Sequence, residues 1–312
     1  MCVGLVEMRC FLLVAARKTR EPAPMPWSRL GLGAGQLGSA ALADDEAERL
    51  VLGAIDQGVT LIDTARGYGP SEARLGQILR GRRAQVALVT KVGYGIAGVP
   101  DWTYRAVAQG VDEALRTLDT DYLDAALLHS CSEQVLQQGE CTQALIDAKA
   151  QGKLRRIGYS GENAALWHAL RAGCWDVLEC SVSLCDQRVL HELLPHARER
   201  GLHVIAKRAL ANAPWRFTSC PRGDYAEEYW WRWHTMDLLG QGLLTERAPA
   251  EVALRFAAFA PGVGSVLIGT TRLDHLRHAC AALAQGPLPD WQVSALRQRF
   301  TACDPGWWVG QV

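Results

Sequence analysis

Short apolar runs without polar alternation recur along this chain, and they constrain its fold more than any other feature. Examples are Val59–Ile62, Val86–Val89 and Ala125–Leu128. Such runs are typical of parallel strands covered on both faces, because side chains that point to either side of the sheet are then buried. The sequence therefore predicts a parallel sheet with helices on its outside.

Amphipathic segments with readable helix ends lie between these runs. Asp44 begins one that closes near Gly58, and Ser71 begins another that closes near Gly81. Alternating strands and helices build a parallel sheet with right-handed crossovers, and eight such units close a barrel. The predicted fold is α/β, a (β/α)8 TIM barrel. The expected strands lie near Leu30–Ala34, Thr60–Asp63, Val86–Lys91, Tyr122–His129, Arg156–Ser160, Asp176–Cys180, His203–Ala206 and Ser265–Ile268.

Length permits this barrel as a single domain over residues 26–312, since closed α/β barrels commonly run to about 250 residues. Residues 1–25 fit it poorly. The apolar run Cys10–Ala16 is far short of the ~20 residues that a spanning helix needs. Arg17–Arg20 stands where a signal peptide would have its cleavage site, so secretion is the weaker alternative. We expect a disordered extension, or a translation start placed too early with Met25 as the true one.

Composition excludes several function classes. Lysine plus arginine equals aspartate plus glutamate, at 33 each, so there is no electrostatic footprint for nucleic acid or an anionic membrane. Ten cysteines are scattered without a C-x-x-C pair, which favours free thiols in a reducing compartment over disulfides or a metal site. We expect a cytoplasmic protein that binds a small molecule and no metal.

One long interruption follows the seventh expected strand, so a long loop after strand seven is part of the prediction. The segment 207–250 is rich in aromatic residues, and loops of this length are usually functional or disordered. We interpret it as a lid or pocket wall over the barrel mouth. The alternative is a helix that packs its aromatic residues on the barrel exterior or against another subunit. The C-terminal Trp307 and Trp308 could form a second wall or could only dock.

Four polar side chains come where the chain leaves a strand. Asp63 and Tyr68 follow the second strand, Lys91 ends the third and His129 ends the fourth. The carboxyl ends of barrel strands form the active-site face. Each residue alone has an ordinary explanation, such as a turn cap or a solvated loop residue. Together they predict one catalytic site that can hold and release a proton.

Five motifs resemble the aldo-keto reductases, in the family's order, over about residues 28–285. They are D-T-A-R-G-Y-G-P-S-E from Asp63, T-K-V-G from Thr90, L-L-H from Leu127, G-K-L-R-R-I-G-Y-S-G from Gly152 and S-V-L-I-G-T-T-R from Ser265. The resemblance implies an NAD(P)H-dependent oxidoreductase that reduces an aldehyde or ketone, or catalyses the reverse reaction, on a TIM barrel.

The resemblance also implies a role for each of the four residues. Tyr68 would donate the proton that quenches the forming alkoxide. A free tyrosine, with a pKa of about 10, holds its proton firmly, so Lys91 is expected to make Tyr68 more acidic. Asp63 would keep Lys91 charged. His129 would donate a hydrogen bond to the substrate oxygen.

The expected cofactor is NADP(H), with NAD possible. The loop Gly269, Thr270, Thr271 and Arg272 precedes a helix whose N-terminus could hold a phosphate, and Arg272 matches the family position that binds the 2′-phosphate of NADPH. The remaining candidate cofactor residues, also from the resemblance, are Gly35, Ser160, Glu179, Lys207 and Leu210.

Several positions depart from the family pattern. Glu179 replaces a glutamine and Lys207 replaces an aromatic residue, both on the nicotinamide side. Gly161 and Ala279 each replace an asparagine. These changes favour a second hypothesis, a barrel that binds NADPH without turnover and acts as a redox sensor or scaffold.

A rival pattern lies near the first strand. Gly33–Gly38 is a formal G-x-G-x-x-G, and Asp63 ends the next strand, which together mimic a dinucleotide-binding fingerprint. Ser39–Ala43 intervene before the next helix, and eight strand-helix units exceed a doubly wound sheet. The barrel is therefore preferred. Substrate, direction and oligomeric state stay open.

Overall fold

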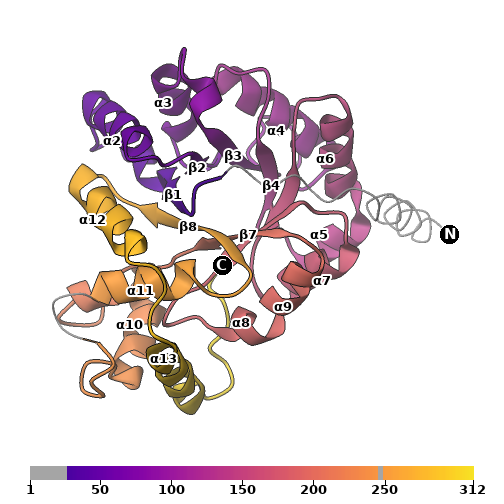
Figure 1. Cartoon of the computed structure of the whole chain (residues 1–312). Helices are drawn as coiled ribbons and strands as arrows, with labels where there is room; N and C mark the ends of the chain where they lie inside the picture. The colour runs from indigo at the N-terminus through magenta and orange to yellow at the C-terminus, as the bar shows by residue number, and fades with distance from the viewer. Residues whose placement is uncertain (1–26, 245–248) are drawn as a thin grey trace.

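The computed structural model describes residues 27–244 and 249–312, and its centre is a closed barrel of parallel strands (Figure 1). The strands pair in chain order, and β1 pairs with both β2 and β8. The predicted (β/α)8 fold is confirmed. The strands are β1 (Leu30–Gly33), β2 (Leu61–Asp63), β3 (Ala87–Val92), β4 (Ala125–His129), β5 (Ile157–Ser160), β6 (Val177–Ser181), β7 (His203–Lys207) and β8 (Val263–Gly269).

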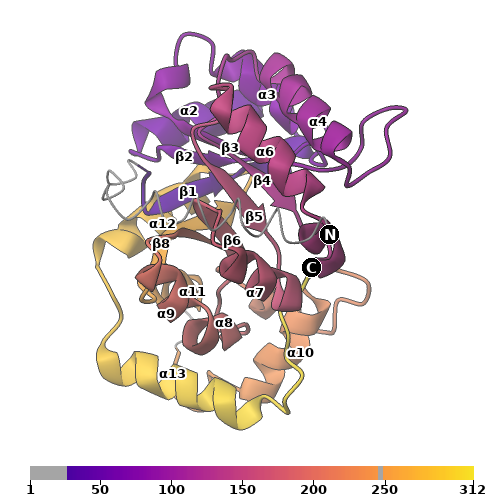
Figure 2. The ribbon, with the colours of Figure 1, turned by 90° about the vertical axis from the view of Figure 1, so that its right-hand side faces the viewer.

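Helices surround the barrel, and Figure 2 shows them from the side. The helices are α2 (Asp44–Asp56), α3 (Ser71–Ile78), α4 (Tyr104–Thr117), α5 (Glu133–Gln138), α6 (Glu140–Ala150), α7 (Asn163–Ala172), α8 (Arg188–Glu192), α9 (Leu194–Glu199), α10 (Glu227–Met236), α11 (Pro249–Ala258), α12 (Leu273–Ala284) and α13 (Asp290–Cys303), with the 3-10 helices η1 (Ala34–Gly38), η2 (Arg83–Gln85) and η3 (Pro214–Arg216).

Two apolar layers explain why the strand sequences do not alternate. The larger layer fills the space between strands and helices. The smaller one fills the barrel interior with side chains from successive strands, including Leu61, Val89, Leu127 and Ile205. Trp27 joins this inner layer and packs edge-on against His203, with the ring centroids 5.0 Å apart. Because both faces of each strand are covered, the continuous apolar runs are accounted for.

The loop that carries Tyr68 is tied to η1. Ser71 Oγ donates to the Ala34 carbonyl at 2.9 Å, and Arg74 Nη1 donates to the Leu37 carbonyl at 2.6 Å. A Cβ at Gly38 would come 2.2 Å from the Tyr68 carbonyl oxygen, so only glycine permits this approach. The glycines that mimic a dinucleotide fingerprint therefore support the loop after β2 instead of beginning a Rossmann helix.

The long excursion after β7 contains α10, which packs on η3 and α13. Its Tyr229 and Trp233 are buried, and Trp215 lies 5.1 Å from Trp233 between ring centroids. Trp231 remains about half exposed. The buried aromatic residues thus pack α10 against η3 and α13, while a lid function and packing on the barrel exterior both stay predictions.

The C-terminal tail crosses the same sector of the barrel. Trp308 is buried against Phe300, whereas Trp307 is exposed. Arg232, itself buried, donates to the Val309 carbonyl at 2.8 Å. The tail is therefore fixed to α10 by a charged side chain that reaches a backbone oxygen.

The composition predicted free thiols and no metal site. Seven cysteines within the described ranges are free, namely Cys131, Cys141, Cys180, Cys185, Cys220, Cys280 and Cys303. The same ranges contain no cluster of His, Cys, Asp and Glu that could hold a metal ion. A bilayer-crossing helix is also not found there, since none combines sufficient length with sufficient hydropathy. The expectations for residues 1–25 lie outside the described residues.

We predict that Gly158→Ala destabilises the barrel. The new Cβ would come 2.5 Å from the Val177 carbonyl oxygen and 2.4 Å from Leu127 Cδ2. Overpacking of this kind costs about 1–3 kcal/mol, measurable by urea unfolding. The matched control is Gly110→Ala in α4, where the nearest atom is Val92 Cβ at 3.4 Å. That variant should be neutral or slightly more stable, because alanine is the better helix former. Equal effects of the two substitutions would contradict this account.

Candidate active site

Lys91 is the centre of the site, at the carboxyl end of β3. Its side chain is only 1% exposed. Nζ donates to Asp63 Oδ2 at the end of β2, and to the Thr64 carbonyl at 3.1 Å. Neighbouring parallel strands end at the same edge, so the barrel brings these two charges together. A buried ammonium requires such a partner, and the predicted Asp63–Lys91 pair is present.

Glu179 on β6 is a second carboxylate on the same lysine. Its Oε2 lies 3.5 Å from Lys91 Nζ, and its Oε1 accepts a hydrogen bond from Ser160 Oγ at 3.1 Å. Oε2 has no hydrogen-bond partner among the described residues, although Glu179 is only 2% exposed. The site therefore holds two buried carboxylates against one ammonium, an arrangement the sequence analysis did not anticipate.

The negative charge of Glu179 changes the pKa values of Asp63 and Lys91. Burial and the charge of Glu179 raise the pKa of Asp63 to about 8, even though Lys91 acts in the opposite direction. Burial lowers the pKa of Lys91, but Asp63 and Glu179 more than reverse this and hold it above its usual value. Lys91 therefore stays charged at neutral pH, and of its two acidic partners Asp63 is the one that tends to keep its proton.

Tyr68 lies beside Lys91, with Nζ 5.3 Å from the centroid of the phenol ring. Lys91 lowers the pKa of Tyr68, but burial and the charges of Asp63 and Glu179 together raise it above its usual value. The predicted effect of Lys91 on Tyr68 is therefore present, but burial and the two carboxylates outweigh it. In this state Tyr68 keeps its proton at neutral pH and can act as a donor.

His129, at the end of β4, is edge-on to Tyr68, with ring centroids 6.0 Å apart. Burial and the charge of Lys91 lower the pKa of His129 to about 3. Its imidazole is therefore neutral at physiological pH, with one N–H to donate. The structure thus brings all four predicted catalytic residues together, from three adjacent strands and one loop.

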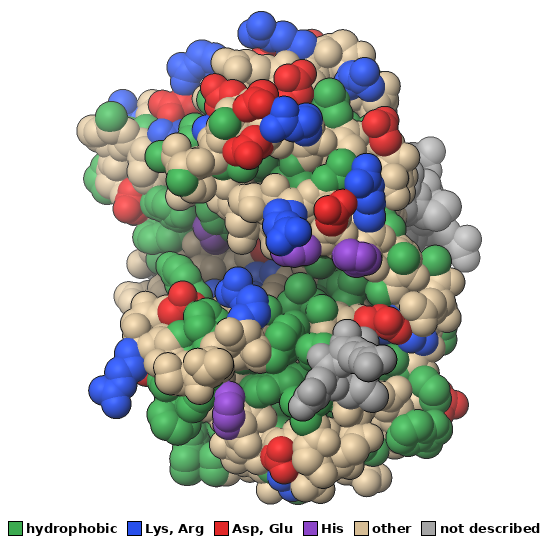
Figure 3. All heavy atoms as spheres, turned by 90° about the vertical axis from the view of Figure 1, so that its left-hand side faces the viewer, with side chains coloured by type: hydrophobic (Ala, Val, Ile, Leu, Met, Phe, Trp, Pro, Cys, Tyr) green, Lys and Arg blue, Asp and Glu red, His purple; other side chains and the backbone are tan. Residues whose placement is uncertain are grey.

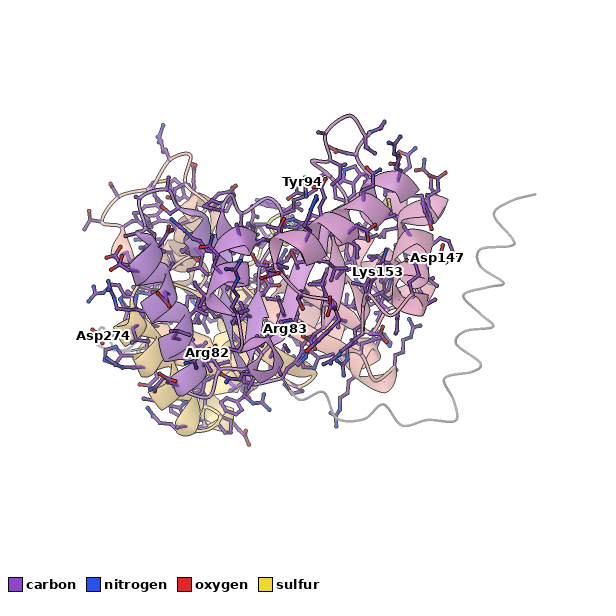
Figure 4. The ribbon with its side chains drawn as sticks, turned by 90° about the horizontal axis from the view of Figure 1, so that it is seen from above. Arg82, Arg83, Tyr94, Asp147, Lys153 and Asp274 are labelled. Atoms are coloured by element: carbon purple, nitrogen blue, oxygen red, sulfur yellow. The ribbon has the colours of Figure 1, made fainter. Side chains whose placement is uncertain are left out.

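The sequence analysis did not identify Tyr94. This residue follows β3 three positions after Lys91, and its hydroxyl lies 2.8 Å from His129 Nδ1. Figure 4 shows Tyr94 toward the end of the barrel opposite Arg82 and Arg83, which precede β3. The only available signal was that Tyr94 is an aromatic residue next to the motif T-K-V-G.

Glu162 was also not identified. It accepts hydrogen bonds from the Ser181 backbone N–H at 2.9 Å and from Ser181 Oγ at 2.7 Å, and it pairs with Lys207 Nζ at 3.3 Å. The C-terminal tail lies over it, because a Cβ at Gly310 would come 2.6 Å from Glu162 Oε2. Lys207, predicted to contact the cofactor, is thus held by a carboxylate beneath the tail.

The departure at Gly161 has a steric cause. An added Cβ would come 2.3 Å from the hydroxyl of Tyr159. That hydroxyl is buried and donates to the Cys131 carbonyl at 2.8 Å. Asparagine is therefore excluded at this position by a tyrosine that fills the same space.

A second group of predicted residues lies at the other side of the barrel mouth. Gly269 ends β8, and a Cβ there would come 2.3 Å from Gln36 Oε1. Thr270 Oγ1 accepts from the Arg272 backbone N–H at 3.0 Å and so shapes the turn into α12. Arg272 is exposed, and Thr271 is exposed beside it. Figure 3 views the side of the molecule that carries α2 and α12, where Lys, Arg and His side chains border a hollow.

The two remaining predicted residues lie near these groups. A Cβ at Gly35 would be 3.9 Å from the Tyr68 ring, so Gly35 lines the space beside the phenol. Leu210 is half-buried in the loop after β7, and its carbonyl accepts from the Ala213 N–H at 2.7 Å. Ala279, the other departure, is buried on α12.

The chain belongs to the aldo/keto reductase family, whose family model matches residues 29–299. A curated relative, the NADH-specific methylglyoxal reductase of Escherichia coli K12, is 27% identical over 82% of this chain and 90% of its own length. Among solved structures, the holo form of the aldo-keto reductase AKR11C1 from Bacillus halodurans is 25% identical. The match covers 88% of this chain and 92% of the AKR11C1 chain, with a TM-score of 0.75.

A further solved structure bears on the cofactor. An aldo/keto reductase from Klebsiella pneumoniae in complex with NADP and acetate is 25% identical over 88% of this chain and 92% of its own, with a TM-score of 0.67. Both NADP and NADH thus occur in the names of proteins similar to this chain, in agreement with the expectation of NADP(H) with NAD possible.

We predict that Glu179→Gln changes how stability depends on pH. The pKa of Asp63 is raised from an unfolded value near 3.9 to about 8 in the folded protein. A raised folded-state pKa contributes stability that is complete below the unfolded pKa and is lost as pH rises through the folded pKa. Between pH 6 and 9 the unaltered protein should therefore lose stability relative to Glu179→Gln, by on the order of 1 kcal/mol.

Urea unfolding of both proteins at pH 6 and pH 9 measures this difference. Glu179 itself has a lowered pKa and stays ionised across the window, so the change reports on Asp63. A stability difference that stays constant with pH, or changes in the opposite direction, would contradict the effect of Glu179 on the pKa of Asp63.

Proposed function

We propose that this protein reduces the carbonyl group of a small aldehyde or ketone with NADPH, NADH being possible, and that Tyr68 is the general acid. The observation that carries the proposal is the convergence of Tyr68, Lys91, Asp63 and His129 at the carboxyl ends of β2, β3 and β4. Family membership supports nicotinamide-dependent carbonyl reduction.

The residues fit a nicotinamide cofactor. Glu179 Oε2 is a buried acceptor to which no group in the described part of the chain donates a hydrogen bond, and a carboxamide N–H₂ would satisfy it. Gly269, Thr271 and Arg272 are exposed before α12, where the helix N-terminus favours a phosphate. When bound, the reduced nicotinamide would supply the hydride. Ser160 and Glu179 would hold its amide, and Lys207, Leu210 and the residues 269–272 would hold the rest of the cofactor.

The proposed chemistry uses the charges described above. Tyr68 carries its proton at neutral pH and releases it to the substrate oxygen as negative charge develops there. The ammonium of Lys91 stabilises the phenolate that remains. Asp63 holds Lys91 in place, Asp63 and Glu179 together keep it charged, and the neutral imidazole of His129 donates its N–H to the same substrate oxygen. The negative charge of Glu179 opposes phenolate formation, so removing it should make Tyr68 more acidic.

Methylglyoxal is the first substrate to test. Two relatives from Escherichia coli carry the names NADH-specific methylglyoxal reductase and methylglyoxal reductase YeaE, the latter 33% identical over 51% of this chain and 56% of its own length. We also propose that the protein is cytoplasmic, which the free thiols of seven described cysteines, Cys174 not among them, support.

We predict that Tyr68→Phe lowers kcat for carbonyl reduction at least about 100-fold, because loss of a positioned general acid costs 10²–10⁴-fold. NADPH binding, measured by fluorescence titration, should persist. Tyr104→Phe is the control, since its hydroxyl contacts Asp147 on α6. Turnover that survives in Tyr68→Phe would exclude this acid.

The same assay separates the enzyme from the redox sensor or scaffold. The ion pairs Lys91–Glu179 and Lys207–Glu162 favour the second hypothesis, because they occupy side chains on the nicotinamide side. Cofactor binding without reduction of any carbonyl in a broad panel, in both the unaltered protein and Tyr68→Phe, would support that hypothesis and contradict the enzyme.

We predict that Arg272→Ala weakens NADPH binding about 10- to 100-fold, because hydrogen bonds to charged groups contribute about 1.5–3 kcal/mol. NADH binding should change much less, since NADH lacks the 2′-phosphate. The control is Arg277→Ala, an exposed arginine on the same helix that pairs with Asp274. Equal losses for NADPH and NADH, or no loss for either, would contradict the assignment of Arg272.

A further inference from the structure

The proposed reaction gives no role to the contact between Tyr94 and His129, which combines a hydrogen bond with ring stacking. The Tyr94 hydroxyl lies 2.8 Å from His129 Nδ1. The two rings also stack, with centroids 5.6 Å apart and planes 28° apart. A hydrogen bond in addition to ring stacking fixes both the position of the imidazole and the environment of one of its nitrogens.

The direction of this hydrogen bond depends on which nitrogen of His129 carries the proton. A neutral imidazole carries one N–H, and its other nitrogen is a good acceptor. Burial raises the pKa of Tyr94 above its usual value and lowers that of His129 to about 3, so the phenol stays protonated and the imidazole neutral. A phenol O–H facing Nδ1 stabilises the tautomer in which Nδ1 has no hydrogen. The proton of His129 then resides on Nε2.

We propose that Tyr94 is a positioning residue, which holds His129 as the Nε2–H tautomer and thereby keeps an N–H donor available for the substrate oxygen. This inference rests on the proposed function of His129 as that donor. With the proton on Nδ1, the histidine would present a lone pair at Nε2, and a lone pair repels the oxygen of a carbonyl.

The surrounding chain is built to hold the Tyr94 hydroxyl in this place. A Cβ at Gly67 would come 2.4 Å from the Tyr94 hydroxyl oxygen, so the loop after β2 leaves room for it. Arg66 in the same loop donates twice to the Gly95 carbonyl, at 3.0 and 2.9 Å. The loops after β2 and β3 are thus joined on both sides of Tyr94.

Trp102 supports the outer side of the tyrosine. Its ring lies 5.6 Å from that of Tyr94 between centroids, and its backbone N–H donates to the Gly93 carbonyl at 2.7 Å. Gly93 has φ +133°, and a Cβ there would come 2.1 Å from the Trp102 ring. Both the conformation and the packing require glycine at that position. Trp102, Tyr94, His129 and Tyr68 therefore form a continuous row of ring contacts toward the proposed acid.

Nuclear magnetic resonance of histidine-¹⁵N-labelled protein reads the tautomer directly, without substrate or cofactor. His129→Gln assigns the resonances. We expect His129 to be the Nε2–H tautomer in the unaltered protein and to show a larger share of the Nδ1–H tautomer in Tyr94→Phe. In the carbonyl reduction assay, kcat should fall about fivefold with KM nearly unchanged, the effect of one net hydrogen bond of about 1 kcal/mol.

Two further variants sharpen the test. Gly67→Ala should displace the Tyr94 hydroxyl and shift the tautomer in the same direction as Tyr94→Phe. Tyr104→Phe removes a hydroxyl of the same kind from α4, where it bonds to Asp147 at 2.8 Å, and should leave the His129 signals unchanged. Thermal melting of each variant checks that it is folded.

An Nδ1–H tautomer in the unaltered protein, or an unchanged tautomer in folded Tyr94→Phe, would overturn the inference. A different result marks failure of the proposed function instead. If the tautomer shifts as expected but neither the unaltered protein nor any variant reduces a carbonyl, Tyr94 still sets the state of His129 and the assigned reaction is wrong.

Discussion

The buried ammonium of Lys91 is the interaction on which the rest of the site depends. It lies between Asp63 and Glu179, each of which is almost completely buried. A charge in this environment is tolerated only with close partners of opposite sign, so the strands that supply those partners must end at the same level. A (β/α)8 barrel meets this requirement, because parallel strands direct their carboxyl ends to one face.

Glu179, the second carboxylate beside Lys91, sets the charge balance of this site. Asp63 and Glu179 both oppose the acidifying effect of Lys91 on Tyr68. Glu179 also raises the pKa of Asp63, and the phenol of Tyr68 is held in its protonated form. We interpret the site as one that stores its proton securely and releases it only when negative charge develops on a substrate.

Much of the architecture follows from local sequence. The apolar runs, the glycines that close helices and the acidic residues that begin them predicted each strand of the barrel within a few residues. The largest difference is at β4, expected from Tyr122 and observed from Ala125. Tyr122 does not pair in the sheet. Its ring is stacked between the guanidinium groups of Arg83 and Arg155.

The position of α10 was less predictable. Its aromatic residues are compatible with either a lid or a docked helix, because apolar surface can be buried against a ligand or against protein. In the structure, Tyr229 and Trp233 are buried against neighbouring protein elements, so these two side chains are docked. Nothing in the spacing of the aromatic residues carries this information.

By itself, the sequence determined the order of strands and helices, the end of the barrel that bears polar groups, and the identity of the four residues that meet there. These properties depend on periodicity and on position relative to a strand end, which are local. Only the tertiary structure decided that Glu179 reaches Lys91 from β6 and that Tyr94 bonds to His129. Both contacts join residues far apart in the chain, so they depend on strand register and side-chain direction. The physical reason is that charge sharing and hydrogen bonding require distances of a few ångströms, which barrel closure alone sets.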